Sequence, residues 1–229
     1  GKCGSSSFFV MMYELVTGDK WDFDGPPWVQ NVYSTRWKNL GHHAFLSKEE
    51  QQKGFKEFFR KNTTSSYFLV RDPRDRLISS FKSKITCDVE FHPDWDDRTR
   101  IVKSTLSLAG LWDEKEPKIC LTFDEYLGAL KIIHESGQHG RLDNHLLPQT
   151  LIFERFMISP DDVDVITEVQ KPDAAGRLFD VFGKERKFDG YPHHHSSGGK
   201  VLEITAKHEE TLKYVTAEEY RVLGPYLIG

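Results

Sequence analysis

The first residues of the chain are of types that can bind an anion. Residues 1–9 read GKCGSSSFF, and an apolar segment, VMMYELV, follows directly. Small residues before an apolar helix favour a turn whose backbone N–H groups point at an anion, with the positive helix N-terminus behind them. The ammonium group of Lys2 would add a point charge. An ordinary helix N-cap after a flexible start has the same composition, so this stretch leaves a phosphate loop and a simple cap both open.

A second candidate for anion binding lies in YFLVRDPRDRLISSFKSK, residues 67–84. The apolar run stopped by a proline predicts a buried strand, and Arg71 follows its carboxyl end, where open α/β sheets bind ligands. Ser79 comes eight residues later, about two helical turns on, and can face the same groove. A planar guanidinium and a hydroxyl together suit a phosphate. The alternative is a surface arginine paired with Asp72 or Asp75.

Taken together, the two stretches resemble the sulfotransferases that use 3′-phosphoadenylyl sulfate (PAPS), in particular the carbohydrate (Golgi-type) branch. A lysine-first Ser/Gly loop is followed by a strand and the pattern RDPxxRLxSxF that begins at Arg71. Looser similarities are TFDEYL (122–127), HLLPQ (145–149), a strand carrying Glu168 and HHHSSGG (193–199). The resemblance therefore touches most of the chain, and its two nucleotide motifs are the specific part.

The resemblance implies a role for individual residues. The loop from Lys2 to Ser7 would hold the 5′-phosphosulfate, and Lys2 would neutralise the bridging oxygen as it leaves. Arg71 and Ser79 would hold the 3′-phosphate, the group that separates PAPS from ATP. We interpret the histidine run 193–195 and the SSGGK after it as a loop closing over the nucleotide, from which Lys200 or His195 would approach the 3′-phosphate. A tag or a metal site is the alternative for the histidine run. The implied nucleotide-binding residues are Lys2, Cys3, Gly4, Ser5, Ser6, Ser7, Arg71, Ser79 and Lys200.

The acceptor hydroxyl needs a general base within hydrogen-bond reach. GHHAF, residues 41–45, lies between the two nucleotide motifs, and some uronyl-type sulfotransferases, which this region resembles, place a catalytic histidine in a comparable segment. We favour His43 and then His42, although spacing does not decide between them and a solvent-facing pair is the alternative. Weaker candidates, each better suited to a cap or a structural contact, are Glu14, Asp124 and Glu168. In HLLPQ, His145 and Gln149 are expected near the acceptor cleft, and a structural turn before Pro148 is the alternative.

The implied reaction is transfer of a sulfuryl group from PAPS to a hydroxyl, most simply of a carbohydrate, by metal-independent in-line displacement that leaves PAP. Such a transfer depends on positioning and charge stabilisation, and no carboxylate cluster in the sequence suggests Mg²⁺. A P-loop kinase or NTPase is one alternative, but its loop places the lysine after the glycines. A non-catalytic nucleotide-binding protein of the same fold is another, which the presence of Lys2 and two candidate bases disfavours.

Composition excludes other classes of protein. The 229 residues carry a net charge of −4 and 13% aromatics, unlike a general nucleic-acid binder. No run approaches the roughly 18 apolar residues that span a bilayer, and no signal peptide is recognised. Three cysteines make no disulfide framework, although one Cys87–Cys120 bridge is compatible with the sequence. We expect the Golgi lumen if the resemblance holds and the cytoplasm otherwise, with any membrane anchor outside this sequence.

The elements that must position these residues follow from short apolar strands alternating with amphipathic helices. This alternation predicts an α/β fold, a P-loop-like parallel sheet flanked by helices, in one sulfotransferase domain over residues 1–229. The strand that normally precedes a phosphate loop is expected before residue 1. Strands are expected at 66–73, 118–123 and 163–169, and helices at 5–17, 48–61, 74–84, 122–134 and 177–182, with a last helix capped by Thr216 and Glu219.

Overall fold

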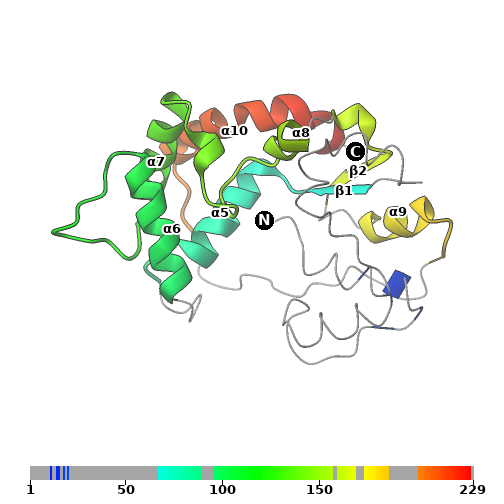
Figure 1. Ribbon diagram of the computed structural model, residues 1–229, viewed down its shortest axis with the longest axis horizontal. Helices are drawn as coiled ribbons and strands as arrows, with labels where there is room; N and C mark the ends of the chain where they lie inside the picture. The colour runs from blue at the N-terminus through cyan, green and yellow to red at the C-terminus, as the bar shows by residue number, and fades with distance from the viewer. Residues whose placement is uncertain are drawn as a thin grey trace, which may run out of the picture. The chain divides into compact units, whose positions relative to one another are not determined.

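The computed structural model describes residues 11, 14, 15, 18, 20, 67–88, 95–156, 159–168, 173–185 and 201–227. They fall into two compact units, each described by itself (Figure 1). The first unit contains the described residues within 71–151 and 201–227. The second contains the described residues up to 70 and those within 152–185.

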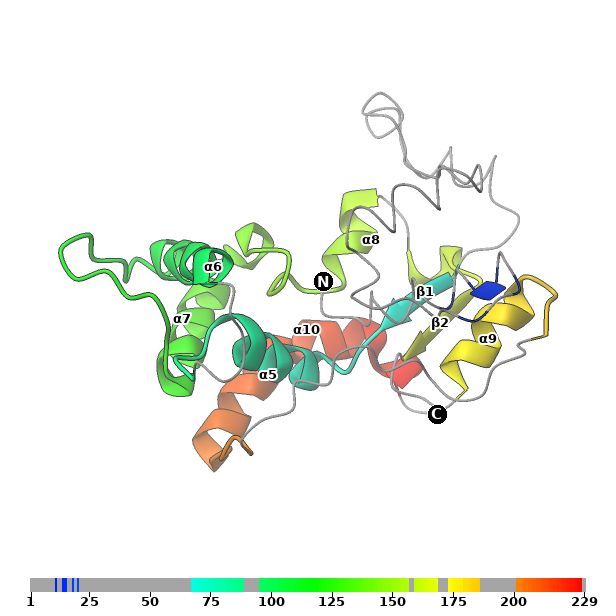
Figure 2. The ribbon, with the colours of Figure 1, turned by 90° about the horizontal axis from the view of Figure 1, so that it is seen from below.

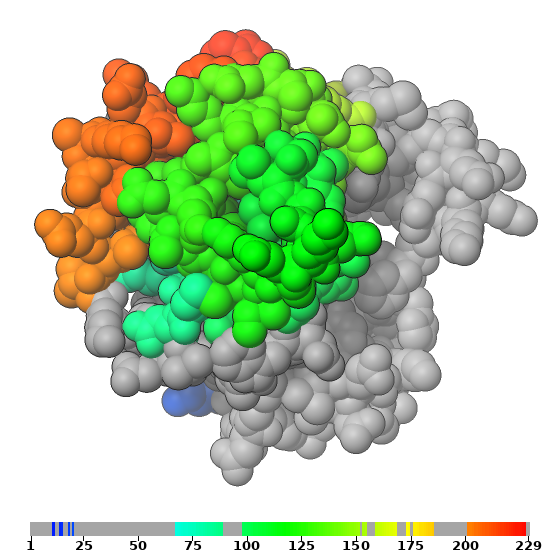
Figure 3. Space-filling model, turned by 90° about the vertical axis from the view of Figure 1, so that its left-hand side faces the viewer, coloured from blue at the N-terminus to red at the C-terminus, as the bar shows by residue number. Residues whose placement is uncertain are grey.

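The main elements of the first unit are helices. They are α5 (Pro73–Lys84), α6 (Trp95–Leu108), α7 (Phe123–Glu135), the short η2 (His139–Arg141) and α10 (Ala206–Leu227). Helix α10 packs against α5 and α7, and Figure 3 shows its first residues, in orange, beside the green residues of this unit. The apolar faces meet in one core that includes Leu77, Phe81, Ile101, Leu106, Tyr126, Leu130 and Leu212.

The predicted helix after Arg71 is confirmed as α5, and its first turn shows why it starts there. The Asp72 carboxylate accepts a hydrogen bond from the backbone N–H of Asp75 at 2.9 Å, and Pro73 occupies the first helical turn, where no N–H is needed. The second predicted start is also confirmed, because Thr122 and Glu125 form a reciprocal capping box at the head of α7. Both starts are local signals, so the sequence alone specifies them.

The last helix begins earlier than predicted. Helix α10 starts at Ala206, and Thr205 caps it: its hydroxyl accepts from the His208 N–H at 3.3 Å, while the His208 Nδ1 accepts from the Thr205 N–H at 3.2 Å. Thr216 is buried inside the helix, and its hydroxyl donates to the Leu212 carbonyl at 2.6 Å. The prediction that Thr216 caps the helix is wrong, because a threonine can bond back to the preceding turn as well as cap.

A parallel strand pair lies in the second unit, as the predicted α/β class requires. Strand β1 (Tyr67–Val70) pairs with β2 (Val165–Glu168), with Val70 opposite Glu168. Helix α9 (Ala174–Val181) packs on β2, as Figure 2 shows. The α9 side chains Leu178 and Phe179 share a buried cluster with Met11 and Leu15 of the predicted first helix. The shorter α8 (Leu151–Phe156) and η3 (Pro160–Asp162) precede β2 along the chain.

The strand predicted at 118–123 is not formed. Leu121 makes only an isolated parallel bridge with Thr86, because the chain turns into the Thr122 cap of α7 directly afterwards. The helix predicted at 48–61 lies outside the described residues. Among the described residues, none of the helices combines the length and the apolar character needed to cross a membrane.

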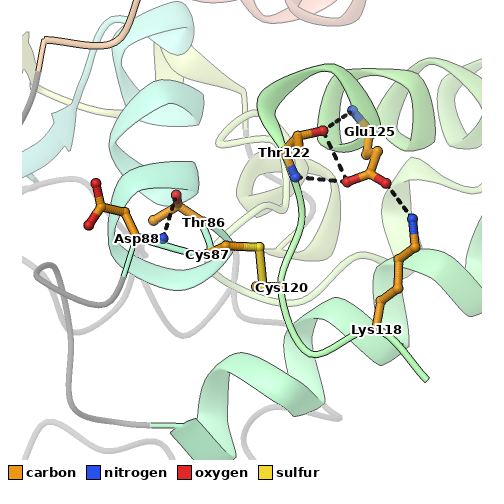
Figure 4. The surroundings of a disulfide bond; sticks show 7 residues. All are labelled: Thr86, Cys87, Asp88, Lys118, Cys120, Thr122 and Glu125. Carbon is orange, nitrogen blue, oxygen red and sulfur yellow. Dashed lines mark hydrogen bonds and ion pairs between the residues drawn. A yellow bond between two sulfur atoms is a disulfide. The ribbon is translucent and has the colours of Figure 1, made fainter. Parts of the chain in front are cut away.

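A disulfide joins Cys87 to Cys120 beside that bridge and ties the end of α5 to the start of α7 (Figure 4). It closes a loop with a sequence separation of 33 residues. Crosslinking such a loop restricts the unfolded chain, so a Cys87→Ala/Cys120→Ala variant should lose about 3–4 kcal/mol of stability. Urea denaturation followed by circular dichroism measures the loss. Reducing agent should lower the wild-type midpoint to that of the variant and leave the variant unchanged; equal midpoints without reductant would contradict the prediction.

Candidate functional site

The described residues contain one side of the predicted site. Arg71 and Ser79 are described, whereas Lys2 to Ser7, His42, His43, Lys200 and the histidine run 193–195 lie outside the described residues. The positions of the expected phosphosulfate loop and base therefore remain predictions. What the structure provides is the setting of Arg71.

Arg71 occupies the predicted place directly after a strand, and the last residue of that strand, Val70, is buried. Strand β1 ends at Val70, and Asp72, the N-cap of α5, follows Arg71. In the Ser79–Ser80 pair of α5, Ser80 is fully buried and its hydroxyl donates to the His145 carbonyl at 2.8 Å. Ser79 is half-buried. The Ser80 hydrogen bond thus ties α5 to the segment around His145. Ser79, in contrast, is partly exposed to solvent.

The backbone of Arg71 is held on both sides by one side chain. Its N–H donates to the Oε1 of Gln149 at 2.9 Å, and the Nε2 of Gln149 donates to the Arg71 carbonyl at 2.8 Å. A side-chain amide thereby satisfies the donor and the acceptor that a neighbouring strand would pair with in a sheet. Gln149, expected near the acceptor cleft or in a turn, therefore contacts the backbone of the arginine of the nucleotide motif.

Gln149 in turn is hydrogen-bonded to Glu219, which forms a buried ion pair with Arg76. The Glu219 Oε1 accepts from the Gln149 backbone N–H at 2.6 Å, and its Oε2 accepts from the Arg76 Nη2 at 2.9 Å. The Arg76 Nη1 also donates to the Leu147 carbonyl at 2.9 Å. Arg76 and Glu219 are 1% and 3% exposed, so each charge depends on the other and on these hydrogen bonds in place of water. Glu219, predicted as part of a helix cap, serves this network.

Helix α10 also holds the segment around Arg71 through exposed and half-buried residues. The Tyr220 hydroxyl donates to Asp72 at 2.6 Å, and burial, followed by this hydrogen bond, raises the pKa of Tyr220. Arg74 makes two hydrogen bonds to Glu209, at 2.9 and 2.5 Å, and pairs with Asp75 at 3.0 Å. Both aspartates proposed as alternative partners of Arg71 therefore have partners of their own.

The turn that contains HLLPQ is fixed by a carboxylate. Asp143 accepts from the His145 backbone N–H at 2.9 Å and from its Nδ1 at 2.6 Å, and pairs with Arg100 at 2.7 Å. Burial alone would raise the pKa of Asp143, but the hydrogen bonds from His145 and Arg100 outweigh it and hold the pKa well below its usual range. The structure thus contains a turn before Pro148, and the place of His145 beside an acceptor stays a prediction.

The weaker base candidates have identifiable surroundings. The Oδ1 of Asp124 lies 3.2 Å from the Nε2 of His208, Glu168 ends β2, and Glu14 is buried. Within the described ranges, no three His, Cys, Asp or Glu side chains lie close enough together to hold a metal ion.

Comparison with known proteins gives the class. A sequence model of the Sulfotransferase family matches residues 1–214, which include the lysine-first loop and the whole segment from Arg71 to Gln149. Searches of curated proteins and of solved structures found no match. The chain therefore belongs to the sulfotransferase family and is an enzyme that transfers a sulfuryl group. Members of this family generally use PAPS as donor and act on hydroxyl-bearing acceptors.

Proposed function

We propose that this enzyme transfers the sulfuryl group of PAPS to a hydroxyl of a carbohydrate by in-line displacement without a metal ion. The observation that carries the proposal is the setting of Arg71, held at the carboxyl end of β1 with Ser79 about two turns along α5. A guanidinium and a hydroxyl so spaced suit the 3′-phosphate, which ATP and other common nucleotides lack. The alternative interpretation, a P-loop kinase, acts on ATP, which has no 3′-phosphate for Arg71 and Ser79 to bind.

The chemistry at the other end of the donor is assigned to residues outside the described ranges. In the proposed mechanism the acceptor oxygen attacks the sulfur as the bond from sulfur to the bridging oxygen breaks, and PAP leaves with the electron pair. Lys2 neutralises that oxygen, the loop from Gly4 to Ser7 binds the phosphate, and His43, or else His42, takes the proton of the acceptor. Lys200 approaches the 3′-phosphate, and the catalytic domain extends over residues 1–229.

The disulfide supports the choice of acceptor and compartment. A Cys87–Cys120 bridge persists in an oxidising compartment and is rare in the cytosol. We therefore place the enzyme in the Golgi lumen, where its hydroxyl acceptors are glycans rather than cytosolic phenols or steroids.

The test is transfer from labelled PAPS to glycans, phenols, steroids and small alcohols, with and without EDTA. Label should pass to a glycan at the same rate in EDTA, because positioning and charge stabilisation need no metal here. Replacing the base should cost about 10²–10⁴ in rate. His43→Ala should therefore lose transfer and keep affinity for 3′,5′-ADP, whereas this pattern in His42→Ala alone would assign the base to His42.

Three results would contradict parts of the proposal. Transfer confined to phenols or steroids would exclude the carbohydrate acceptor. Strict dependence of this transfer on a divalent metal would exclude displacement without a metal ion. Full activity of both His43→Ala and His42→Ala would place the base elsewhere in the chain.

A further inference from the structure

We infer that Gln149 and Glu219 are positioning residues for the nucleotide: they hold the backbone of Arg71 so that its guanidinium meets the 3′-phosphate. The inference rests on the proposed function, because it takes Arg71 as the ligand of that phosphate. It extends the site to helix α10, beyond residue 214, where the family match ends.

The first step is the place of Arg71 in the chain. It is one of two residues between the last residue of β1 and the first of α5, where the backbone changes from strand to helix. The rotation of its peptide groups sets the direction in which its Cα–Cβ bond points. Gln149 fixes this rotation on both sides, since it accepts from the Arg71 N–H and donates to the Arg71 carbonyl. Two hydrogen bonds to one residue restrain its backbone as a strand partner would.

The second step is the orientation of the Gln149 amide. Its Nε2 lies 3.4 Å from the Glu219 Oε1 as well as 2.8 Å from the Arg71 carbonyl. Both neighbours are acceptors, so the NH₂ group must face them. A flipped amide would place its oxygen against a carboxylate and a carbonyl. Glu219 and the Arg71 carbonyl therefore together favour the one orientation in which Oε1 meets the Arg71 N–H.

The third step is the rigidity of Glu219. Its Oε1 accepts from the Gln149 N–H at 2.6 Å, its Oε2 from Arg76 at 2.9 Å, and the whole group is buried. These contacts join residues 70, 78 and 143 positions apart in the sequence. Two directional hydrogen bonds, between Glu219 and Gln149 and between Gln149 and Arg71, thus connect α10 to the Arg71 backbone, and the buried ion pair with Arg76 holds Glu219 in place.

A Gln149→Met variant tests the inference, because methionine has a similar size and forms neither bond to Arg71. Calorimetry should show the Kd for 3′,5′-ADP raised about tenfold, because the net free energy of one hydrogen bond corresponds to about this factor in Kd. The Kd for 5′-AMP, which lacks the 3′-phosphate, should stay within about twofold. In an Arg71→Ala background the same substitution should change neither Kd, because the effect acts through Arg71.

The controls separate positioning from a general loss of structure. Gln138→Met changes the same side chain in the same unit, where it bonds only to Ser136 and Arg141, and should leave both constants unchanged. Gln149→Asn, one methylene shorter, provides a second test should Gln149→Met fail to fold. Unchanged affinity in both Gln149 variants, equal loss for both nucleotides, or full additivity with Arg71→Ala would each overturn the inference. Equal affinity of the wild type for the two nucleotides would instead overturn the proposed function.

Discussion

Replacing Arg71 with alanine is expected to weaken binding of 3′,5′-ADP by about 100-fold and to leave binding of 5′-AMP within about twofold. The reason is that a guanidinium meets a phosphate through two parallel charge-assisted hydrogen bonds, and alanine offers none. Arg71→Lys should lie between the two, since the ammonium keeps the charge but not the planar pair of donors. Isothermal titration calorimetry with the two nucleotides measures the difference directly.

The neighbouring arginine offers a matched control for this prediction. Arg74 lies three residues along the chain, is about one-third exposed and pairs with Glu209 on α10. Arg74→Ala removes the same charge from the same segment, so it should lower the affinity for the two nucleotides alike, and only slightly. Equal effects of the Arg71 and Arg74 substitutions would mean that general positive charge, and not a 3′-phosphate ligand at Arg71, explains nucleotide binding.

The sequence alone predicts the features of this site that are determined by residues adjacent in the chain. The apolar run of β1, the proline after Asp72 and the spacing from Arg71 to Ser79 are local patterns, and the strand and α5 appear where they predict. The capping box of Thr122 and Glu125 is equally local. Each of these features is determined within a few residues, which is why no knowledge of the fold is needed to find it.

The support of Arg71 could not be found in this way. Gln149 and Glu219 are 78 and 143 positions from the residues that they hold, Arg71 and Arg76. A buried glutamate two turns from a helix end has the same sequence appearance as a capping or surface glutamate. The pattern T-x-x-E at Thr216 in fact favours the cap, which the structure shows to be wrong. Only the packing of α10 on α5 identifies the role of Glu219.

Helix α6 is a further element that was not predicted. Its sequence, WDDRTRIVKSTLSL, contains four polar residues in its first five positions, and β-branched residues that favour strands as much as helices. Its buried residues Ile101, Val102 and Leu106 face the core shared with α7. Tertiary packing, rather than intrinsic helix propensity, therefore stabilises α6, and this kind of stability leaves a weak pattern in the sequence.

Glu219→Ala is expected to destabilise the protein by about 3–5 kcal/mol, among the largest effects of any single substitution in the described residues. The substitution leaves the Arg76 guanidinium, 1% exposed, without its counter-charge, and removes the acceptor of the Gln149 N–H. Urea denaturation at neutral pH measures the change in the free energy of unfolding. Glu218→Ala is the matched control. The Glu218 carboxylate pairs with Arg221 on the exposed face of α10, so its loss should hardly move the midpoint of denaturation.

A second variant shows whether the uncompensated charge causes this loss. The double substitution Arg76→Met/Glu219→Leu replaces the pair by apolar side chains of comparable volume, so it should recover most of the stability that Glu219→Ala loses. It should not recover full affinity for 3′,5′-ADP, because the backbone N–H and the amide of Gln149 both lose the Glu219 carboxylate that holds them beside Arg71. A stable double variant that binds 3′,5′-ADP as the wild type does would show that the ion pair serves folding alone. A Glu219→Ala variant as stable as Glu218→Ala would show that the pair is not buried in solution as it is in the structure.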